Sequence, residues 1–247
     1  MYSVIICTIN PWKFAAVKAM YAAAFGDAPW ELIGIHDAKS AAEGNNRGFE
    51  KSRGDIVIFS HDDIEIISPY FPQRLTGHLA KYDIVGVAGS SLAVSAVWYD
   101  AGPPYLLGQM VYPQASGALG VNIYGAASRV ASAQAVDGVF IAARRSVFDR
   151  VKFDAVTFEG FQCWDQDFCR RACLAGLKIG VACDINLIHH SQRKSDENSR
   201  QCVNRFDDKW RAWVDEMAPR RRPRFAWTLV IVPNRAECLS VMTPTYW

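Results

Sequence analysis

A group of acidic and imidazole side chains directly follows a short apolar segment. Residues 55–60 (Asp-Ile-Val-Ile-Phe-Ser) lead into His61, Asp62 and Asp63. Carboxylates at the end of a strand beside a cleft suit a hard divalent cation, which takes oxygen ligands and can carry phosphate oxygens as well. Such a cation would offset the negative charge of a departing diphosphate. The segment is therefore a candidate metal site, and the alternative is a solvated acidic turn.

Two further groups of residues could take part in chemistry. Asp165 and Asp167 lie at the start of a predicted helix, where one carboxylate could act as a general base toward a hydroxyl group. The helix dipole favours acids in a first turn, so N-terminal capping is the simpler explanation of this pair taken alone. His189 and His190 lie at the end of a predicted strand. Imidazole is a common ligand for transition-type metals, although a lone histidine pair is more often structural.

The elements that must position these residues begin at the N-terminus. Short apolar runs predict strands, and the segments between them predict helices, with Ser40 and Glu43 as a capping box at the start of the second helix. In order, these elements are strand 3–8, helix 13–25, strand 30–36, helix 40–52 and strand 55–60. This alternation predicts a parallel sheet with right-handed crossovers. Ligands bind at the carboxyl ends of such strands, so residues 8–10, Asp37 and residues 61–63 should converge on one crevice.

The remaining chain is less regular. Residues 89–135 are rich in Gly, Ala, Ser, Pro and aromatic residues and predict irregular structure with short strands or hairpins, and residues 191–205 predict a polar loop. The other predicted elements are helices 68–80, 145–151, 164–175 and 206–217 and strands 83–88, 136–142, 178–182 and 185–189.

Taken in order, the segments resemble the glycosyltransferase family 2 lineage of the A-type glycosyltransferase (GT-A) fold, and most of all its bacterial glycosyltransferase-like subgroup. The resemblance covers residues 2–192 and rests on an ordered set of motifs. These are the first strand, an Asn-x-Gly-x-x-x-Ser-x-Gly-Asp stretch, a variant of the Asp-x-Asp metal motif, an acceptor-side strand and a Trp-Asp-Gln-Asp motif, at residues 2–8, 46–55, 61–63, 136–145 and 164–167.

The resemblance implies an α/β fold with a Rossmann-like, mostly parallel central sheet flanked by helices. It implies a catalytic domain over residues 1–192, with a nucleotide-binding half (1–88) and an acceptor-side half (89–192). Residues 193–247 would form a C-terminal loop, helix and tail.

It also implies roles for single residues. Asp63 would hold Mn²⁺ or Mg²⁺ together with His61, which replaces the first acid of the motif, and His189 or its neighbour His190. Asp165 would be the catalytic base and Asp167 a supporting acid. The nucleotide sugar would contact Thr8, Asn10, Asp37, Asn46, Asp62, Gly138 and Arg193, the last acting with Lys194 as a clamp on the diphosphate.

The implied function is a metal-dependent glycosyltransferase (EC 2.4). It would move a sugar from a nucleoside-diphosphate sugar to a hydroxyl of a carbohydrate or other acceptor, with inversion if Asp165 is the base. Two alternatives stay open. One is a nucleotide-sugar-binding protein whose site is degenerate and inactive. The other is a nucleotidyltransferase, which more typically has a Gly-rich basic loop after the first strand, whereas residues 8–12 contain no glycine.

Composition limits the other possibilities. A chain of 247 residues with 50% apolar content can bury one large core, and a net charge of +2 argues against a nucleic-acid partner, although residues 220–224 form a basic cluster. The number of cysteines is odd, at seven, and no CxxC pair occurs, which favours thiols in a cytoplasmic protein. No signal peptide or long apolar run is visible. Peripheral contact with the inner face of a membrane and the oligomeric state are left open.

Overall fold

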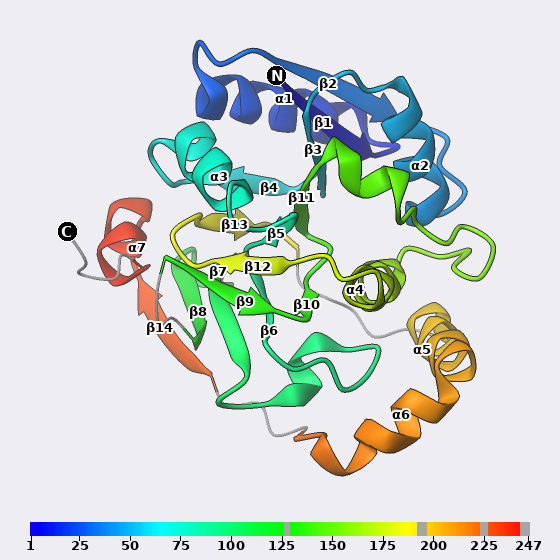
Figure 1. The fold of residues 1–247 in the computed structure, drawn as a ribbon. Helices are drawn as coiled ribbons and strands as arrows, with labels where there is room; N and C mark the ends of the chain where they lie inside the picture. The colour runs from blue at the N-terminus through cyan, green and yellow to red at the C-terminus, as the bar shows by residue number, and fades with distance from the viewer. Residues whose placement is uncertain (126–128, 192–196, 223–226, 243–247) are drawn as a thin grey trace.

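The computed structural model describes residues 1–125, 129–191, 197–222 and 227–242. Within these ranges the strands form two seven-stranded sheets (Figure 1). The first has the order β2-β1-β3-β11-β5-β12-β9, with β1 (Tyr2–Cys7), β2 (Trp30–Ile35), β3 (Ile56–Ser60), β5 (Ile84–Gly86), β9 (Val130–Ala133), β11 (Phe140–Arg144) and β12 (Ile179–Ala182). The second joins β4 (Ile64–Ile66), β6 (Ala88–Ser90), β7 (Leu106–Pro113), β8 (Leu119–Gly125), β10 (Ala135–Val136), β13 (Leu187–His189) and β14 (Thr228–Val232).

Helices cover both faces of the first sheet and extend over the C-terminal part of the chain. The α-helices are α1 (Pro11–Phe25), α2 (Ala41–Lys51), α3 (Phe71–Leu79), α4 (Trp164–Leu174), α5 (Glu197–Lys209), α6 (Arg211–Met217) and α7 (Arg235–Met242). Three short 3₁₀ helices are Trp98–Ala101, Arg145–Asp149 and Ala218–Arg220. In the part of the chain that the structure describes, no helix combines the length and apolar character needed to cross a membrane.

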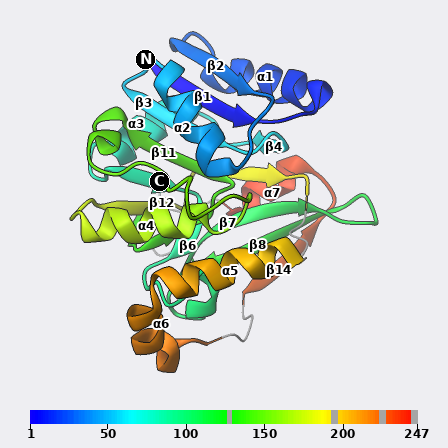
Figure 2. The same ribbon diagram turned by 90° about the vertical axis from the view of Figure 1, so that its right-hand side faces the viewer.

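The core lies on both faces of the first sheet. Side chains along a strand alternate between its two faces. Val4 of β1 and Ile58 of β3 therefore join the cluster under α1 and α3, whereas Ile5 and Val57 join the cluster under α2 and α4 (Figures 1 and 2). This two-sided burial accounts for the continuous apolar runs that predict these strands.

The first sheet is mixed, and five of its seven strands run in one direction, so the expectation of a mostly parallel sheet is confirmed. β1 pairs in parallel with β2 and β3, and β12 pairs in parallel with β5. However, β11 is antiparallel to both β3 and β5, and β9 is antiparallel to β12. A buried central strand is apolar on both faces whichever way it runs, so the pattern of residues 140–144 does not show its direction.

Residues 89–135 are more regular than the sequence predicts. β7 and β8 form a long antiparallel hairpin, and β14 adds to the free edge of β8. α7 packs against β8. Part of the C-terminal segment thus completes the second sheet.

The prediction of a polar loop over residues 191–205 is wrong for the second half of this segment, because α5 begins at Glu197. Ser199, Cys202 and Phe206 are the buried residues of this helix and lie along one side of it. Cys202 and Phe206 belong to the cluster that includes Phe168 of α4. The narrow buried stripe within a charged segment is what the sequence-based prediction missed.

Candidate active site

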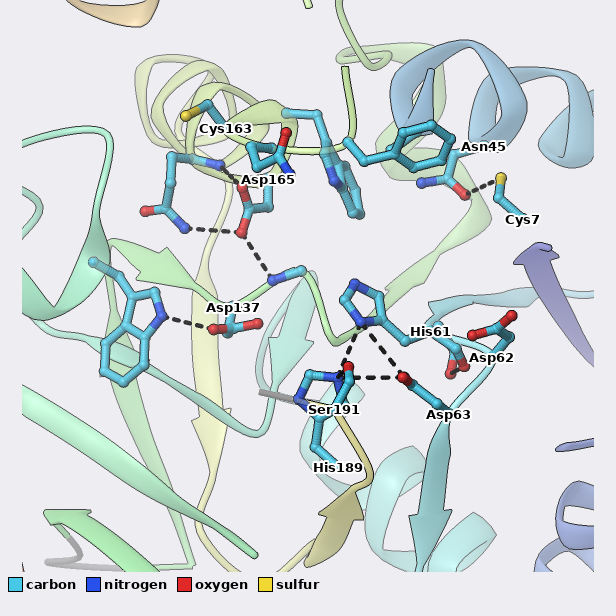
Figure 3. A pocket seen from close by; sticks show the side chains of 18 of the residues that line it. Cys7, Asn45, His61, Asp62, Asp63, Asp137, Cys163, Asp165, His189 and Ser191 are labelled. Carbon is cyan, nitrogen blue, oxygen red and sulfur yellow. Dashed lines mark hydrogen bonds and ion pairs between the residues drawn. The ribbon is translucent and has the colours of Figure 1, made fainter. Parts of the chain in front are cut away.

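A cavity of about 380 Å³ opens where the two sheets and α4 meet (Figure 3). Its wall takes residues from segments that are far apart in the sequence. They include Cys7, Asn45, His61, Asp62, Asp63, Trp98, Tyr112, Asp137, Gly138, Trp164, Asp165, His189 and Ser191. The predicted acidic motif, the first three residues of the Trp-Asp-Gln-Asp motif and one predicted histidine therefore share one cavity.

Three of these side chains bring possible metal-ligating atoms together. Nε2 of His189 lies 3.3 Å from Nδ1 of His61 and 3.3 Å from Oδ1 of Asp63. Nδ1 of His61 lies 3.9 Å from the same carboxylate oxygen. Their ligand atoms all lie within 4.8 Å of one another.

The backbone fixes this cluster. Residues 61–63 connect β3 to β4, and His189 on β13 stands opposite Ile64 in the register of the sheet. The backbone N–H of His190 donates to the carbonyl of Asp63 at 2.9 Å. The side chain of His190 lies elsewhere, with Nε2 3.6 Å from Glu65. The histidine that faces the candidate metal site is therefore His189.

The contacts within this cluster suit a bound cation better than they suit a set of hydrogen bonds among the three side chains. The buried oxygen Oδ1 of Asp63 has no hydrogen-bond partner of good geometry, although both ring nitrogens are close to it. Desolvation within the cluster and the neighbouring His189 lower the pKa of His61, which favours a neutral ring with a lone pair to offer. Burial opposes the charge on Asp63, but the nearby polar groups of His189, Ser191 and His61 outweigh it and hold the pKa of this carboxyl well below the usual range. Two imidazole nitrogens and one carboxylate oxygen form a donor set that suits a divalent transition-type metal such as Mn²⁺.

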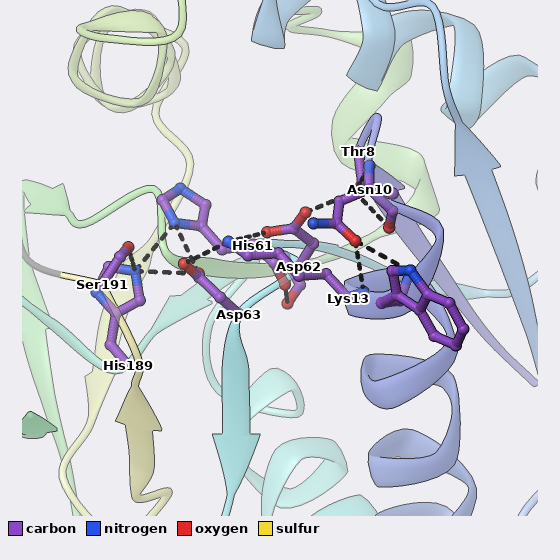
Figure 4. Close-up of polar contacts among 10 residues, drawn as sticks. Thr8, Asn10, Lys13, His61, Asp62, Asp63, His189 and Ser191 are labelled. Atoms are coloured by element: carbon purple, nitrogen blue, oxygen red, sulfur yellow. Dashed lines mark hydrogen bonds and ion pairs between the residues drawn. The ribbon is translucent and has the colours of Figure 1, made fainter. Parts of the chain in front are cut away.

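A polar chain connects this cluster to the end of β1 (Figure 4). The hydroxyl of Thr8 donates to Oδ2 of Asp62 at 2.5 Å, and Nζ of Lys13 lies 3.4 Å from Oδ1 of Asp62 and 3.2 Å from Oδ2 of Asp63. Asn10 caps α1, because its side-chain oxygen accepts hydrogen bonds from two backbone N–H groups of the first turn, at 3.0 and 3.1 Å. The predicted convergence of Thr8 and residues 61–63 is confirmed by these contacts.

On the other side of the cavity, Asp165 is held by three donors. The backbone N–H of Gly138 donates to Oδ2 at 2.8 Å, and Gln166 donates its backbone N–H to Oδ1 at 2.9 Å and its amide to Oδ2 at 3.2 Å. Burial and the nearby charge of Asp137 nevertheless raise the pKa of Asp165 to about 6. Asp137 itself accepts from Nε1 of Trp98 at 2.8 Å and from the backbone N–H of Val139 at 2.9 Å.

Five of the described predicted site residues do not line this cavity, namely Thr8 and Asn10, whose contacts are given above, and Asp37, Asn46 and Asp167. Asp37 is 80% exposed and pairs with Arg47 at 2.6 Å. The amide of Asn46 exchanges hydrogen bonds of 2.8 and 3.1 Å with the backbone of Phe153. Asp167 is completely buried, and its Oδ1 meets the Lys209 ammonium at 2.6 Å and the Trp210 indole at 2.9 Å. Arg193 and Lys194 lie outside the described residues.

The structure also adds residues that the motifs do not identify. Asn45, next to the predicted Asn46, is the one whose side chain reaches the cavity, where its oxygen lies 3.6 Å from the Cys7 thiol. Ala41, Asn45 and Gly48 are buried on one side of α2, and helical spacing of these small and polar residues is the signal that could have identified Asn45. Asp137 lies in the turn before β11 and Trp98 begins a short 3₁₀ helix, and neither segment has such periodicity.

Comparison with solved structures supports the same architecture. GalNAc-T7 with UDP, GalNAc and Mn²⁺ aligns with a TM-score of 0.55 at 12% identity, over 88% of this chain and 49% of that chain. S. aureus TarS 1–349 in complex with UDP-GlcNAc aligns at 0.48 and 12%, over 80% and 60%, and A197 from STIV at 0.41 and 12%, over 79% and 96%. The chain thus spans about half of the GalNAc-T7 chain. The likeness to GalNAc-T7 shows a shared GT-A fold, with the mixed sheet described above.

Comparisons at the level of sequence give one family. A search of curated proteins finds no significant match. Residues 3–210 match the model of the glycosyltransferase-like family, and this segment holds both sides of the cavity. The chain therefore belongs to the glycosyltransferase-like family.

Proposed function

We propose that the protein is a metal-dependent hexosyltransferase that moves a sugar from a nucleoside-diphosphate sugar to an acceptor hydroxyl with inversion. The observation that carries this proposal is that the His61–Asp63–His189 cluster and the Asp165 carboxylate line one cavity. Leaving-group stabilisation and proton removal are the two tasks of such a transfer, and the cavity offers a group for each.

His61, Asp63 and His189 would hold the cation, with Mn²⁺ favoured over Mg²⁺ by the two imidazole ligands. When bound, the cation supplies positive charge against the diphosphate as the bond between sugar and phosphate breaks. UDP is the nucleotide to test first, because the GalNAc-T7 structure holds UDP together with Mn²⁺.

The nucleoside would lie near the carboxyl ends of β1 and β2. Asn45 presents an amide to the cavity beside Cys7, and the exposed carboxylate of Asp37 follows the end of β2. We assign Thr8 and Asn10 to shaping this region, since Thr8 orients Asp62 and Asn10 fixes the start of α1.

Asp165 would take the proton from the acceptor hydroxyl. The acceptor oxygen then forms the new bond to the anomeric carbon from the side opposite the leaving diphosphate, and the electron pair of the broken bond leaves with that diphosphate. A pKa near 6 leaves the carboxylate ionised at neutral pH and basic enough to accept a proton. The Gly138 N–H and the Gln166 side chain keep the carboxylate in place without protonating it.

The experiment is a thermal-shift screen of nucleotide sugars with Mn²⁺, followed by transfer assays with the donor that stabilises the protein. Asp165→Asn should retain donor binding and lose transfer, whereas the exposed Asp27→Asn should retain both. Full transfer by Asp165→Asn would remove the base assignment. Donor binding with no transfer or hydrolysis in the wild type would favour a nucleotide-sugar-binding protein with a degenerate site.

A further inference from the structure

Lys13 lies beside the metal cluster and has no part in the reaction proposed above. Its ammonium group stands between two carboxylates, 3.4 Å from Oδ1 of Asp62 and 3.2 Å from Oδ2 of Asp63 (Figure 4). Asn10 caps α1 and so fixes the turn that carries Lys13. α1 also packs against β4, whose first residue directly follows Asp63. The fold therefore holds both ends of this contact in place.

The two oxygens of Asp63 face different neighbours. Oδ1 lies 3.3 Å from His189 and 3.9 Å from His61, whereas Oδ2 lies against Lys13. A cation that binds between the histidines would therefore meet one oxygen of this carboxylate, and the other oxygen would stay with the ammonium group. The two oxygens of Asp62 also face different neighbours, because Oδ2 accepts from the Thr8 hydroxyl and Oδ1 lies toward Lys13.

The local charge follows from these contacts. Two carboxylates and one ammonium leave a single net negative charge for an incoming divalent cation, so the site with its cation carries a net positive charge. A nucleoside diphosphate is an anion that would neutralise that excess. Without Lys13, the two carboxylates alone would balance the cation.

We infer that Lys13 is a resident counter-cation of the metal site, which weakens binding of a free divalent cation and couples cation binding to diphosphate binding. This inference rests on the proposed function, because it needs the cation site. It makes Lys13 a positioning residue that acts through Asp62 and Asp63. It also predicts that removal of Lys13 strengthens binding of one ligand, a result that mere loss of structure would not give.

The test is Mn²⁺ binding by electron paramagnetic resonance, which counts free Mn²⁺ and needs no turnover. Lys13→Met should bind Mn²⁺ alone on the order of tenfold more tightly than the wild type. Lys18→Met, in which an exposed lysine of the same helix is replaced, should bind like the wild type. UDP should strengthen Mn²⁺ binding in the wild type, and this coupling should be smaller in Lys13→Met.

The outcomes separate the inference from the proposed function. Equal or weaker Mn²⁺ binding by a folded Lys13→Met protein, with measurable binding by the wild type, overturns the role of Lys13 alone. If the wild type binds no Mn²⁺ with or without UDP, the metal site and the inference fall together. Lys13→Gln, a smaller change that keeps a polar end, serves as a second variant should circular dichroism show that the methionine variant is unfolded.

Discussion

The backbone N–H of Gly138 donates a hydrogen bond of 2.8 Å to the carboxylate of Asp165, and a side chain at position 138 would crowd this contact. A Cβ atom at position 138 would lie 3.1 Å from Oδ2 of Asp165 and 2.9 Å from the ring of Trp164. The glycine therefore lets the proposed base sit directly against the turn that precedes β11. The same turn carries Asp137, so the position and the basicity of Asp165 depend on one short segment.

Gly138→Ala should displace Asp165 by a fraction of an ångström and lower kcat on the order of tenfold, because a full displacement of about 1 Å can cost a reaction about 10²-fold. Gly77→Ala is the matched control, since nothing lies within 4 Å of a Cβ there. It should leave kcat unchanged and stabilise α3 by roughly 0.5–1 kcal/mol. Steady-state kinetics and urea unfolding measure the two effects. Normal kcat in Gly138→Ala would show that the close approach to Asp165 does not serve the reaction.

The pH dependence of transfer should reflect the environment of Asp165. Its pKa is raised to about 6 by burial and by the charge of Asp137, so activity should fall as the pH drops through about 6 and protonates the base. Asp137→Asn removes the nearby charge and should move this acidic limb to lower pH. The measurement is kcat/KM between pH 4.5 and 8 for both proteins. An unshifted limb in the variant would mean that Asp137 has no electrostatic influence on the reacting group.

The first sheet shows how far sequence alone can predict this fold. The starts or ends of β1, β2 and β3 fall within one residue of prediction, because each is a buried run of β-branched and apolar side chains between clear turn signals. The antiparallel direction of β11 and the start of α5 at Glu197 were not predictable in the same way. Both depend on tertiary partners, namely the strands on either side of β11 and the α4 surface under Cys202.

The residues of the candidate site also fall into two groups, those whose position the sequence predicts and those whose position depends on tertiary structure. Residues at or just after the end of a strand, such as His189 and Asp63, are placed by topology, and they meet in the structure. Asn45 directly precedes the motif that begins at Asn46, and which of the two faces the cavity depends on the rotation of α2. Asp137 lies within the acceptor-side motif at residues 136–145, but that motif predicts a strand and gives no role to Asp137.

The two neighbouring histidines offer a direct test of the metal site. His189→Ala should abolish Mn²⁺ binding and stop metal-dependent transfer, because it removes one of three ligands from the cluster. His190→Ala should leave Mn²⁺ affinity within about twofold of the wild type, since its ring lies toward Glu65 rather than the cavity. Chelation with EDTA should reproduce the His189→Ala result in the wild type. Calorimetric titration of Mn²⁺ checks all three, and loss of binding in His190→Ala alone would reverse the assignment.

Asp167 separates a catalytic role from a structural one. Its carboxylate is fully buried and pairs with Lys209 and Trp210, which ties α4 to the junction of α5 and α6. Asp167→Ala leaves the partly buried Lys209 ammonium without this partner, although Asp154 still lies 2.6 Å from it. We therefore expect a loss of about 3 kcal/mol in the free energy of unfolding, at the low end for a broken buried pair, with kcat reduced less than tenfold in the folded fraction. Denaturant unfolding and single-turnover transfer below the unfolding transition measure the two quantities. A large fall in kcat with unchanged stability would make Asp167 a supporting acid of the reaction after all, and would require the α5–α6 junction to move during turnover.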